Sequence, residues 1–120
     1  MSHVKTYEFE SYEKAGQTFV IEGPVSKDYL QTMTFDEGLD AFRIPIAQFE
    51  AIQDISTLDE GRIYIIRKAQ HIIGYVTYLY PDPMERWSTG NLPYLLELGA
   101  IEISLPYRGL GLGNALLKVS

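Results

Sequence analysis

The chain has 120 residues, a formal net charge of −6 and no cysteine. One domain of this length can bury a sizeable core. The lack of cysteine excludes disulfides, thiolate catalysis and cysteine-based zinc sites. The acidic balance disfavours broad nucleic-acid binding, which depends on a basic surface. It suits a cytoplasmic enzyme, a protein whose partner carries positive charge, or solubility alone.

Neither a signal peptide nor a membrane span is predicted, because the N-terminal segment lacks an apolar core and no apolar run is long enough. We therefore expect a cytoplasmic protein. The two histidines, His3 and His71, have no partner histidine nearby in the sequence, so no metal site is predicted.

The first half of the chain predicts a β-hairpin followed by helices. The segments "KTYEFES" (5–11) and "QTFVIEG" (17–23) read as strands joined by the turn "EKAG". A helix is expected to begin near Ser26, a suitable N-cap. A second helix is predicted from Pro45 to about Thr57, where Pro45 suits the first turn. Its apolar stripe at helical spacing consists of Ile46, Phe49, Ile52 and either Ile55 or Ser56.

The second half is rich in β-forming residues. "GRIYIIRK" (61–68) and "HIIGYVTYLY" (71–80) flank "AQ" and predict an antiparallel hairpin. A loop with three prolines spans 81–93, and a strand follows over 94–104, with Gly99 marking a bulge or a close backbone approach. A glycine turn then leads into a helix. The order predicts an α+β fold with a mostly antiparallel sheet.

Gly109, Gly111 and Gly113 form a ladder between the last strand and the last helix. Such a turn directs backbone N–H groups, and the positive end of a helix dipole, at one anion, which is usually phosphate. A P-loop is excluded because Asn114, not lysine, follows Gly113. The dinucleotide fingerprint is also excluded, because its sixth place, counted from Gly109, is Asn114. A tight turn without any ligand is the alternative.

Arg108–Gly113 matches the pattern Arg/Gln-x-x-Gly-x-Gly/Ala and so resembles the coenzyme A pyrophosphate motif of the GNAT superfamily of N-acetyltransferases. The resemblance implies a GNAT fold with acetyl-CoA as co-substrate. It also implies that the preceding strand pairs with the pantetheine arm around Glu102, Ile103 and Ser104, where an N–H meets the thioester carbonyl. The implied coenzyme A site is Ile103, Ser104, Arg108, Gly109, Leu110, Gly111, Leu112, Gly113 and Asn114.

Five longer blocks are similar to the bacterial acetoin-utilisation acetyltransferases over roughly residues 21–120: "IEGPVS", "AFRIP", "EGRIYI", "GYVTYLYPDPMERWS" and "LELGAIEI". This resemblance implies a protein lysine acetyltransferase whose partner and substrate is acetyl-CoA synthetase. Two alternatives stay open: an acetyltransferase for a small amine, and a fragment that folds or binds without catalysing.

Two glutamates are candidates for the general base that deprotonates the amine. Many family members place a glutamate eleven residues before the Arg/Gln of the turn, which is the position of Glu97. Glu102 is the rival, since its place is often small and apolar in the superfamily. The alternative for each residue is an ordinary solvated or ion-paired strand carboxylate.

The loop 81–93 is expected to border the acceptor site. Asp82 and Glu85 would attract a basic peptide, and Trp87 would pack on the lysine stem or, alternatively, lie in the core. Tyr75, Tyr78 and Tyr80 are expected to be strand packing.

The resemblance also implies further strands and a helix after this segment, so residues 1–120 are expected to form the N-terminal portion of one GNAT domain. The edge of the strand 94–104 is then expected to be unpaired, and to be covered by a second copy, by exchanged elements or by another chain. Weak coenzyme A binding and little turnover are expected of these residues alone.

Overall fold

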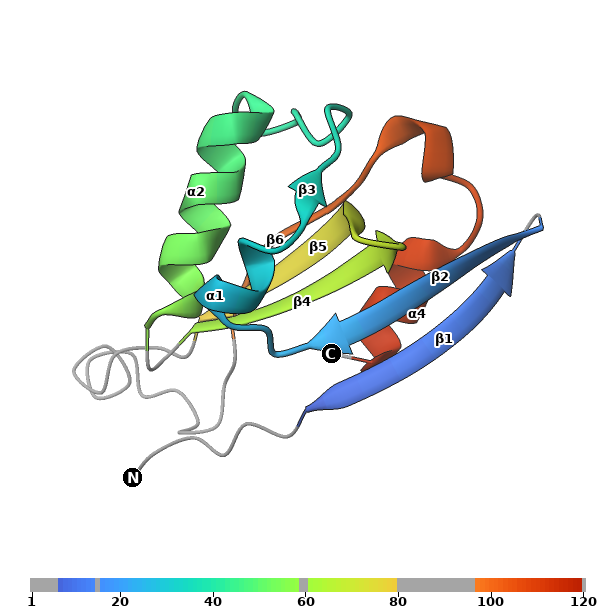
Figure 1. The fold of residues 1–120 in the computed structure, drawn as a ribbon, viewed down its shortest axis with the longest axis horizontal. Coiled ribbons are helices and arrows are strands. Elements are labelled where there is room, and N and C mark those ends of the chain that lie inside the picture. The colour runs from blue at the N-terminus through green and yellow to red at the C-terminus, as the bar shows by residue number, and fades with distance from the viewer. Residues whose placement is uncertain (1–6, 15, 59–60, 80–96, 120) are drawn as a thin grey trace.

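The computed structural model describes residues 7–14, 16–58, 61–79 and 97–119. Within them a sheet of six strands has helices on both faces (Figure 1). The strand order is β1-β2-β4-β5-β3, and β6 also pairs with β5. The elements in chain order are β1 (Glu8–Lys14), β2 (Gln17–Gly23), α1 (Lys27–Leu30), β3 (Thr34–Phe35), α2 (Pro45–Ser56), β4 (Gly61–Lys68), β5 (His71–Leu79), β6 (Glu97–Ile103), the 3-10 turn η1 (Leu105–Tyr107) and α4 (Leu112–Val119).

Both predicted hairpins are confirmed. β1 pairs antiparallel with β2, and β4 pairs antiparallel with β5. The first turn is tighter than "EKAG" suggested, because β1 continues to Lys14, which pairs with Gln17. Gly16 adopts a φ of +74° there, a left-handed conformation that glycine reaches without steric cost.

The outer edge of β5 is shared by two strands lying end to end. The two-residue strand β3 runs parallel to β5 at His71 and Ile72, and β6 runs antiparallel to it from Gly74 to Leu79. The strand β3 was not predicted, because two residues carry no alternating pattern. No described strand pairs with the other edge of β6, and the expectation that this edge is covered stays a prediction.

The core consists of two apolar clusters, one on each face of the sheet. Alternation along β4 separates them, since Ile63 and Ile65 face α1 and α2, while Ile66 faces α4. Buried residues of the first cluster include Leu30 and Ile52, from α1 and α2. The second cluster contains Phe19, Ile21, Ile73, Val76, Leu112 and Leu116.

Helix α2 confirms the predicted start at Pro45 and most of the predicted stripe, because Ile52 is buried in the core and Phe49 and Ile55 pack against it. Ile46 is 69% exposed, whereas Gln48 is only 5% exposed and Ile52 is fully buried. The helix is therefore rotated so that an amide side chain, not Ile46, faces the sheet. Within the predicted stripe, only Ile46 is misplaced.

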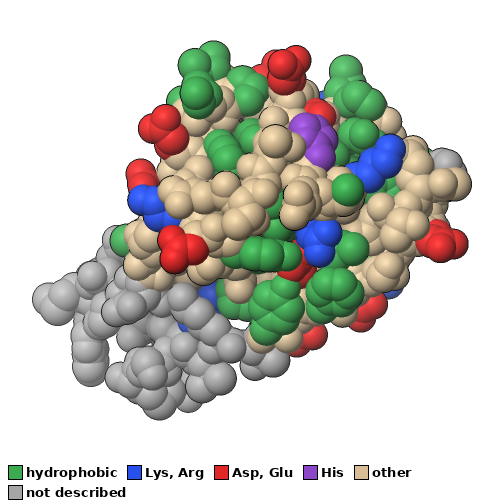
Figure 2. Space-filling model, viewed as in Figure 1, with side chains coloured by type: hydrophobic (Ala, Val, Ile, Leu, Met, Phe, Trp, Pro, Cys, Tyr) green, Lys and Arg blue, Asp and Glu red, His purple; other side chains and the backbone are tan. Residues whose placement is uncertain are grey.

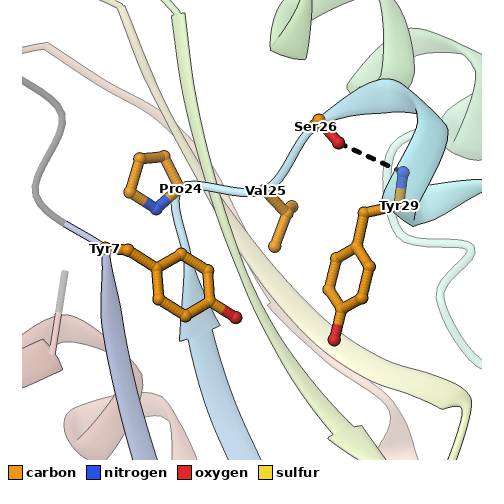
Figure 3. A pocket seen from close by; sticks show the side chains of 5 residues that line it. All are labelled: Tyr7, Pro24, Val25, Ser26 and Tyr29. Carbon is orange, nitrogen blue, oxygen red and sulfur yellow. Dashed lines mark hydrogen bonds between the residues drawn. The ribbon is translucent and has the colours of Figure 1, made fainter.

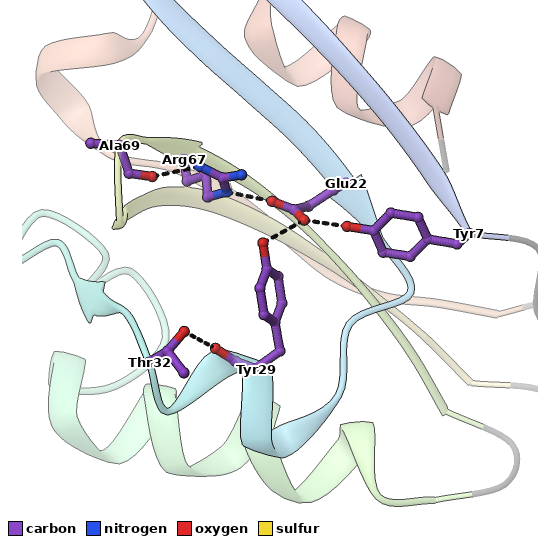
Figure 4. Close-up of polar contacts among 6 residues, drawn as sticks. All are labelled: Tyr7, Glu22, Tyr29, Thr32, Arg67 and Ala69. Atoms are coloured by element: carbon purple, nitrogen blue, oxygen red, sulfur yellow. Dashed lines mark hydrogen bonds and ion pairs between the residues drawn. The ribbon is translucent and has the colours of Figure 1, made fainter.

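A buried carboxylate ties the first hairpin to α1 and β4. Glu22, on β2, is 1% exposed and accepts hydrogen bonds from the hydroxyls of Tyr7 and Tyr29 and from the guanidinium of Arg67 (Figure 4). Burial raises the pKa of Glu22, but these three donors outweigh it, so the pKa of the carboxyl is lowered overall. Tyr7 and Tyr29 also flank a cavity of about 340 Å³ beside Pro24 and Val25 (Figure 3).

We predict that Tyr29→Phe lowers the free energy of unfolding by about 1–2 kcal/mol at pH 7, because Glu22 loses one of its donors. The depressed pKa of Glu22 means that its stabilising contribution is present above the unfolded value of about 4.3 and is lost as the pH falls through the lower folded value. The difference in the free energy of unfolding between Tyr29→Phe and the unchanged protein should therefore become smaller as the pH falls. Urea unfolding at several pH values measures it.

The control is Tyr12→Phe, a partly buried tyrosine of β1 that packs with the α4-side cluster and does not contact Glu22. Its deficit should not depend on pH between 7 and 3. An equal deficit of Tyr29→Phe at every pH would contradict the role assigned to the Glu22 carboxylate.

Candidate functional site

The glycine turn between β6 and α4 presents open backbone. Gly109 and Gly111 have φ values of +85° and +76°, and no atom lies within 4 Å of the place where a Cβ would stand at either residue. The N–H of Ala115 donates to the carbonyl of Gly111 at 3.1 Å, so the helical hydrogen bonds begin there. The first-turn N–H groups, Leu112 to Asn114, have no intrahelical acceptor. They are available, together with the helix dipole, to an anion.

A cavity of about 240 Å³ lies against this turn. Its lining includes Ile103, Arg108, Gly109, Gly111, Leu112, Gly113 and Asn114, so the structure brings most of the predicted coenzyme A site together in one place. Leu110 instead packs beside the α4-side core cluster. The turn thus combines left-handed glycines, unpaired N–H groups and a hollow, which is what a bound phosphate group requires.

Arg108 holds the turn against the outer edge of β6. Its Nε donates to the carbonyl of Ile103 at 2.7 Å. The N–H of Ser104 donates to the carbonyl of Ile73 at 2.8 Å, inside the sheet. Because antiparallel strands alternate, Ile103 directs its own N–H away from β5. Around Glu102, Ile103 and Ser104, where one N–H is expected to meet a thioester, the N–H of Ile103 therefore faces the open edge, and that of Ser104 is already engaged.

A polar junction fixes the end of β6. The buried hydroxyl of Ser104 donates to the carboxylate of Asp36, which also accepts from the N–H of Gly38 at 2.9 Å. His71 Nε2 lies 2.7 Å from the same carboxylate, and His71 Nδ1 lies 2.6 Å from Thr34 Oγ1. A Cβ on Gly38 would stand 2.1 Å from Ser104 Oγ, so glycine is required for this approach. The junction joins β3 to β6 immediately before the turn.

The negative charge of the Asp36 carboxylate is stabilised by the hydrogen-bond donors around it. Burial raises the pKa of Asp36, but hydrogen bonds from Ser104, His71 and the Gly38 N–H outweigh it and lower the pKa overall. His71 thus has a structural role in pairing with Asp36. In the described part of the chain, no group of three or more His, Asp or Glu side chains is placed to hold a metal ion.

Glu102 lies on the face of β6 opposite to Ile103, on the side of α2. It is 4% exposed, and its Oε1 accepts from the hydroxyl of Tyr75 at 2.7 Å while its Oε2 accepts from the N–H of Ala41 at 2.8 Å. Nε2 of Gln48 in turn donates to the Tyr75 hydroxyl at 2.8 Å. Burial first, and then the bond to Glu102 and its charge, raise the pKa of Tyr75. Tyr75 therefore stays protonated and acts as a donor.

Glu97 begins β6 opposite Leu79, and its side chain lies outside the described part of the structure. The bulge predicted at Gly99 is confirmed, because Thr77 pairs with Ala100 while Tyr78 pairs with Leu98. Tyr80 and the acceptor-loop candidates Asp82, Glu85 and Trp87 also lie outside the described residues.

A larger cavity, of about 490 Å³, lies between α2 and the neighbouring ends of β5 and β6. Gln48 and Thr77 line it, together with the apolar side chains of Phe42, Ile55, Leu79 and Ala100. Sequence reasoning missed Gln48, and it treated Tyr75 as packing. The sequence signal that could have found Gln48 is its position four residues before Ile52, because residues at this spacing lie on the same face of a helix.

The surface agrees with the acidic composition. On the face shown in Figure 2, lysine and arginine side chains of the described residues are scattered among acidic and apolar ones and form no continuous patch. No helix in the described ranges has the length and apolarity needed to cross a membrane.

Comparison with known proteins places the chain in a family. The profile described as "Acetyltransferase (GNAT) family" matches residues 27–119. The acetoin utilization protein AcuA is 52% identical in Bacillus subtilis and 48% identical in Bacillus licheniformis, in both cases over the whole of this chain and 57% of the relative. A crystal structure of an acetoin utilization protein from Exiguobacterium sibiricum superposes with a TM-score of 0.86 at 50% identity. That match covers 98% of this chain and 56% of the other.

The chain thus spans little more than half the length of the relatives it matches. The family profile nevertheless covers more than half of the chain, and it includes the glycine turn, the Asp36–Ser104 junction and the network around Glu102. The chain belongs to the acetyltransferase (GNAT) family.

Proposed function

We propose that the protein transfers an acetyl group from acetyl-CoA to an amine. The observation that carries this proposal is the glycine turn, in which two left-handed glycines and the start of α4 surround a cavity of about 240 Å³ at the end of β6. A diphosphate fits these groups, because N–H donors and a helix N-terminus favour negative charge. The family's general use of acetyl-CoA supports the same donor.

In this proposal the N–H groups of residues 109–114 bind the pyrophosphate, and Arg108 keeps the turn against β6 through its bond to Ile103. The pantetheine arm follows the open edge of β6, where the N–H of Ile103 is oriented to meet the thioester carbonyl. A donor in that place stabilises the oxyanion that forms when the amine attacks. The C–N bond forms, the C–S bond breaks, and coenzyme A leaves as a thiol.

We predict that Gly111→Ala weakens coenzyme A binding at least tenfold, as measured by titration calorimetry on the full-length protein and on these 120 residues. An alanine at a φ of +76° is strained, so the turn must shift its N–H groups. Gly16→Ala is the matched control, because Gly16 has a φ of +74° but lies in the β1–β2 turn.

Gly113→Ala is a second control, since Gly113 is helical and the family pattern admits alanine there. Both controls should keep the affinity of the unchanged protein. A loss of affinity as large in Gly16→Ala as in Gly111→Ala would show that strain, and not the cradle, determines binding.

We further propose that Glu97 is the general base, acting through water, and that Glu102 is a positioning residue because both of its oxygens are already occupied by Tyr75 and Ala41. Glu97→Gln should lower kcat/KM by about 10²-fold and remove the acid limb of its pH profile, which is the usual size of a lost general base. An unchanged pH profile in Glu97→Gln, with the limb lost in Glu102→Gln, would instead make Glu102 the base.

We propose that the acceptor is a lysine of a target protein, with acetyl-CoA synthetase as that target, on the basis of the extended similarity to the acetoin utilization proteins. Radiolabelled acetyl-CoA should label acetyl-CoA synthetase in preference to polyamines when both are offered to the full-length protein. Faster labelling of the polyamines would favour the alternative, a small-molecule amine acetyltransferase.

A further inference from the structure

Three large apolar side chains are exposed where the chain enters α2. Phe42 is 56% exposed, Ile44 is 66% exposed and Ile46 is 69% exposed. They lie close together in the sequence, and we call them the 42–46 surface. Single exposed apolar residues are ordinary, but several on one short segment indicate a place where another molecule binds.

Two carboxylate bonds fix the loop that leads into this surface to β6. The Asp36 carboxylate accepts from the hydroxyl of Ser104, and the Glu102 carboxylate accepts from the N–H of Ala41 at 2.8 Å. Glu102 and Ser104 flank Ile103, whose N–H is assigned above to the thioester carbonyl. The 42–46 surface therefore begins at a fixed position relative to the proposed site of acetyl transfer, and it loses little conformational freedom when a partner binds.

The charges around the 42–46 surface are mostly negative. Figure 2 shows apolar and acidic side chains next to each other over the start of α2 and the loop before it. This balance favours a partner with positive charge, and it disfavours both a second copy of this chain and an anionic membrane surface. The exposed charged residues of segment 37–54 are Glu37, Asp40, Arg43, Glu50 and Asp54.

We propose that the 42–46 surface docks the polypeptide acceptor, and that the segment it recognises carries apolar and basic side chains close to the acetylated lysine. This inference rests on the proposed transfer of acetyl to a protein lysine. Phe42 also lines the cavity of about 490 Å³, together with Thr77 and Ala100, so the 42–46 surface is continuous with a hollow beside β6. A segment docked there holds its lysine close to the strand along which the thioester is proposed to lie.

Peptide binding to the full-length protein tests the proposal without any turnover. The probe is a fluorescent synthetic peptide in which leucines and arginines surround one lysine, and fluorescence anisotropy measures its binding. A second peptide has glutamate in place of each arginine, and a third has serine in place of each leucine. Both should bind at least tenfold more weakly than the first. Equal binding of either peptide would overturn the proposal.

Two phenylalanines of similar exposure separate the 42–46 surface from the rest of the molecule. Phe42→Ser should weaken binding of the first peptide at least tenfold, whereas Phe9→Ser, at a residue 57% exposed on β1, should leave it unchanged. Asp40→Asn should weaken binding about threefold, as expected for one exposed charge pair. Asp28→Asn, at another exposed aspartate, should not. An equal loss in Phe42→Ser and Phe9→Ser would overturn the assignment.

Kinetics with two acceptors distinguish docking from a structural role of Phe42. Phe42→Ser should raise KM for the first peptide at least tenfold and leave kcat unchanged, while KM for n-butylamine and the affinity for coenzyme A stay constant. The same change in KM for both acceptors would overturn the docking role. Failure of the unchanged protein to acetylate either acceptor would contradict the proposed function instead, and peptide binding would still test the 42–46 surface.

Other occupants of the 42–46 surface would give different results. If a second copy covered it, Phe42→Ser would lower the mass measured by analytical ultracentrifugation. If another segment of the full-length protein covered it, the first peptide would not bind, and Phe42→Ser would unfold at a lower urea concentration than Phe9→Ser. Either result would overturn the proposal.

Discussion

The hydrogen bonds that join Asp36 to Ser104 determine where the candidate site lies. β3 and β6 share one edge of β5, and neither strand pairs with the other through its backbone. The Asp36 carboxylate bridges them by binding the Ser104 hydroxyl and the Gly38 N–H. Ser104 is the last residue before the 3-10 turn, so this junction fixes the point at which the chain leaves the sheet and begins the glycine cradle.

Because side chains alternate along β6, the glycine turn and the Glu102 network lie on opposite faces of this strand. Ile103 lies on the α4 side with the glycine turn, whereas Glu102 lies on the α2 side with Tyr75. The backbone edge between them carries the N–H of Ile103. A donor molecule bound at the turn and an acceptor bound beside α2 would therefore meet across one strand, close to the Gly99 bulge where the pairing with β5 shifts.

Local features of the sequence were enough to predict the hairpins, the start of α2, the bulge and the glycine turn, because each depends on neighbouring residues. The contacts that position the site were not predictable in this way. Ser104 and Asp36 are 68 residues apart, and β3 is too short to show a period. The predicted stripe of α2 was wrong only at Ile46, which is exposed, whereas a network with Tyr75 and Glu102 draws Gln48 to the sheet. Tertiary hydrogen bonding overrode the apolar pattern there.

Among the described residues, hydrogen bonds account for three carboxylates with little or partial exposure, but not for one buried amide oxygen. Glu22 has three donors, Asp36 has three and Glu102 has two, so each of these carboxylates is explained by the contacts it makes. Gln48 alone among the described residues keeps an unpaired buried side-chain atom, its amide oxygen. The amide nitrogen of Gln48 donates to Tyr75, which in turn donates to Glu102, so the network explains the inward position of this side chain and the cost of burying it falls on the oxygen.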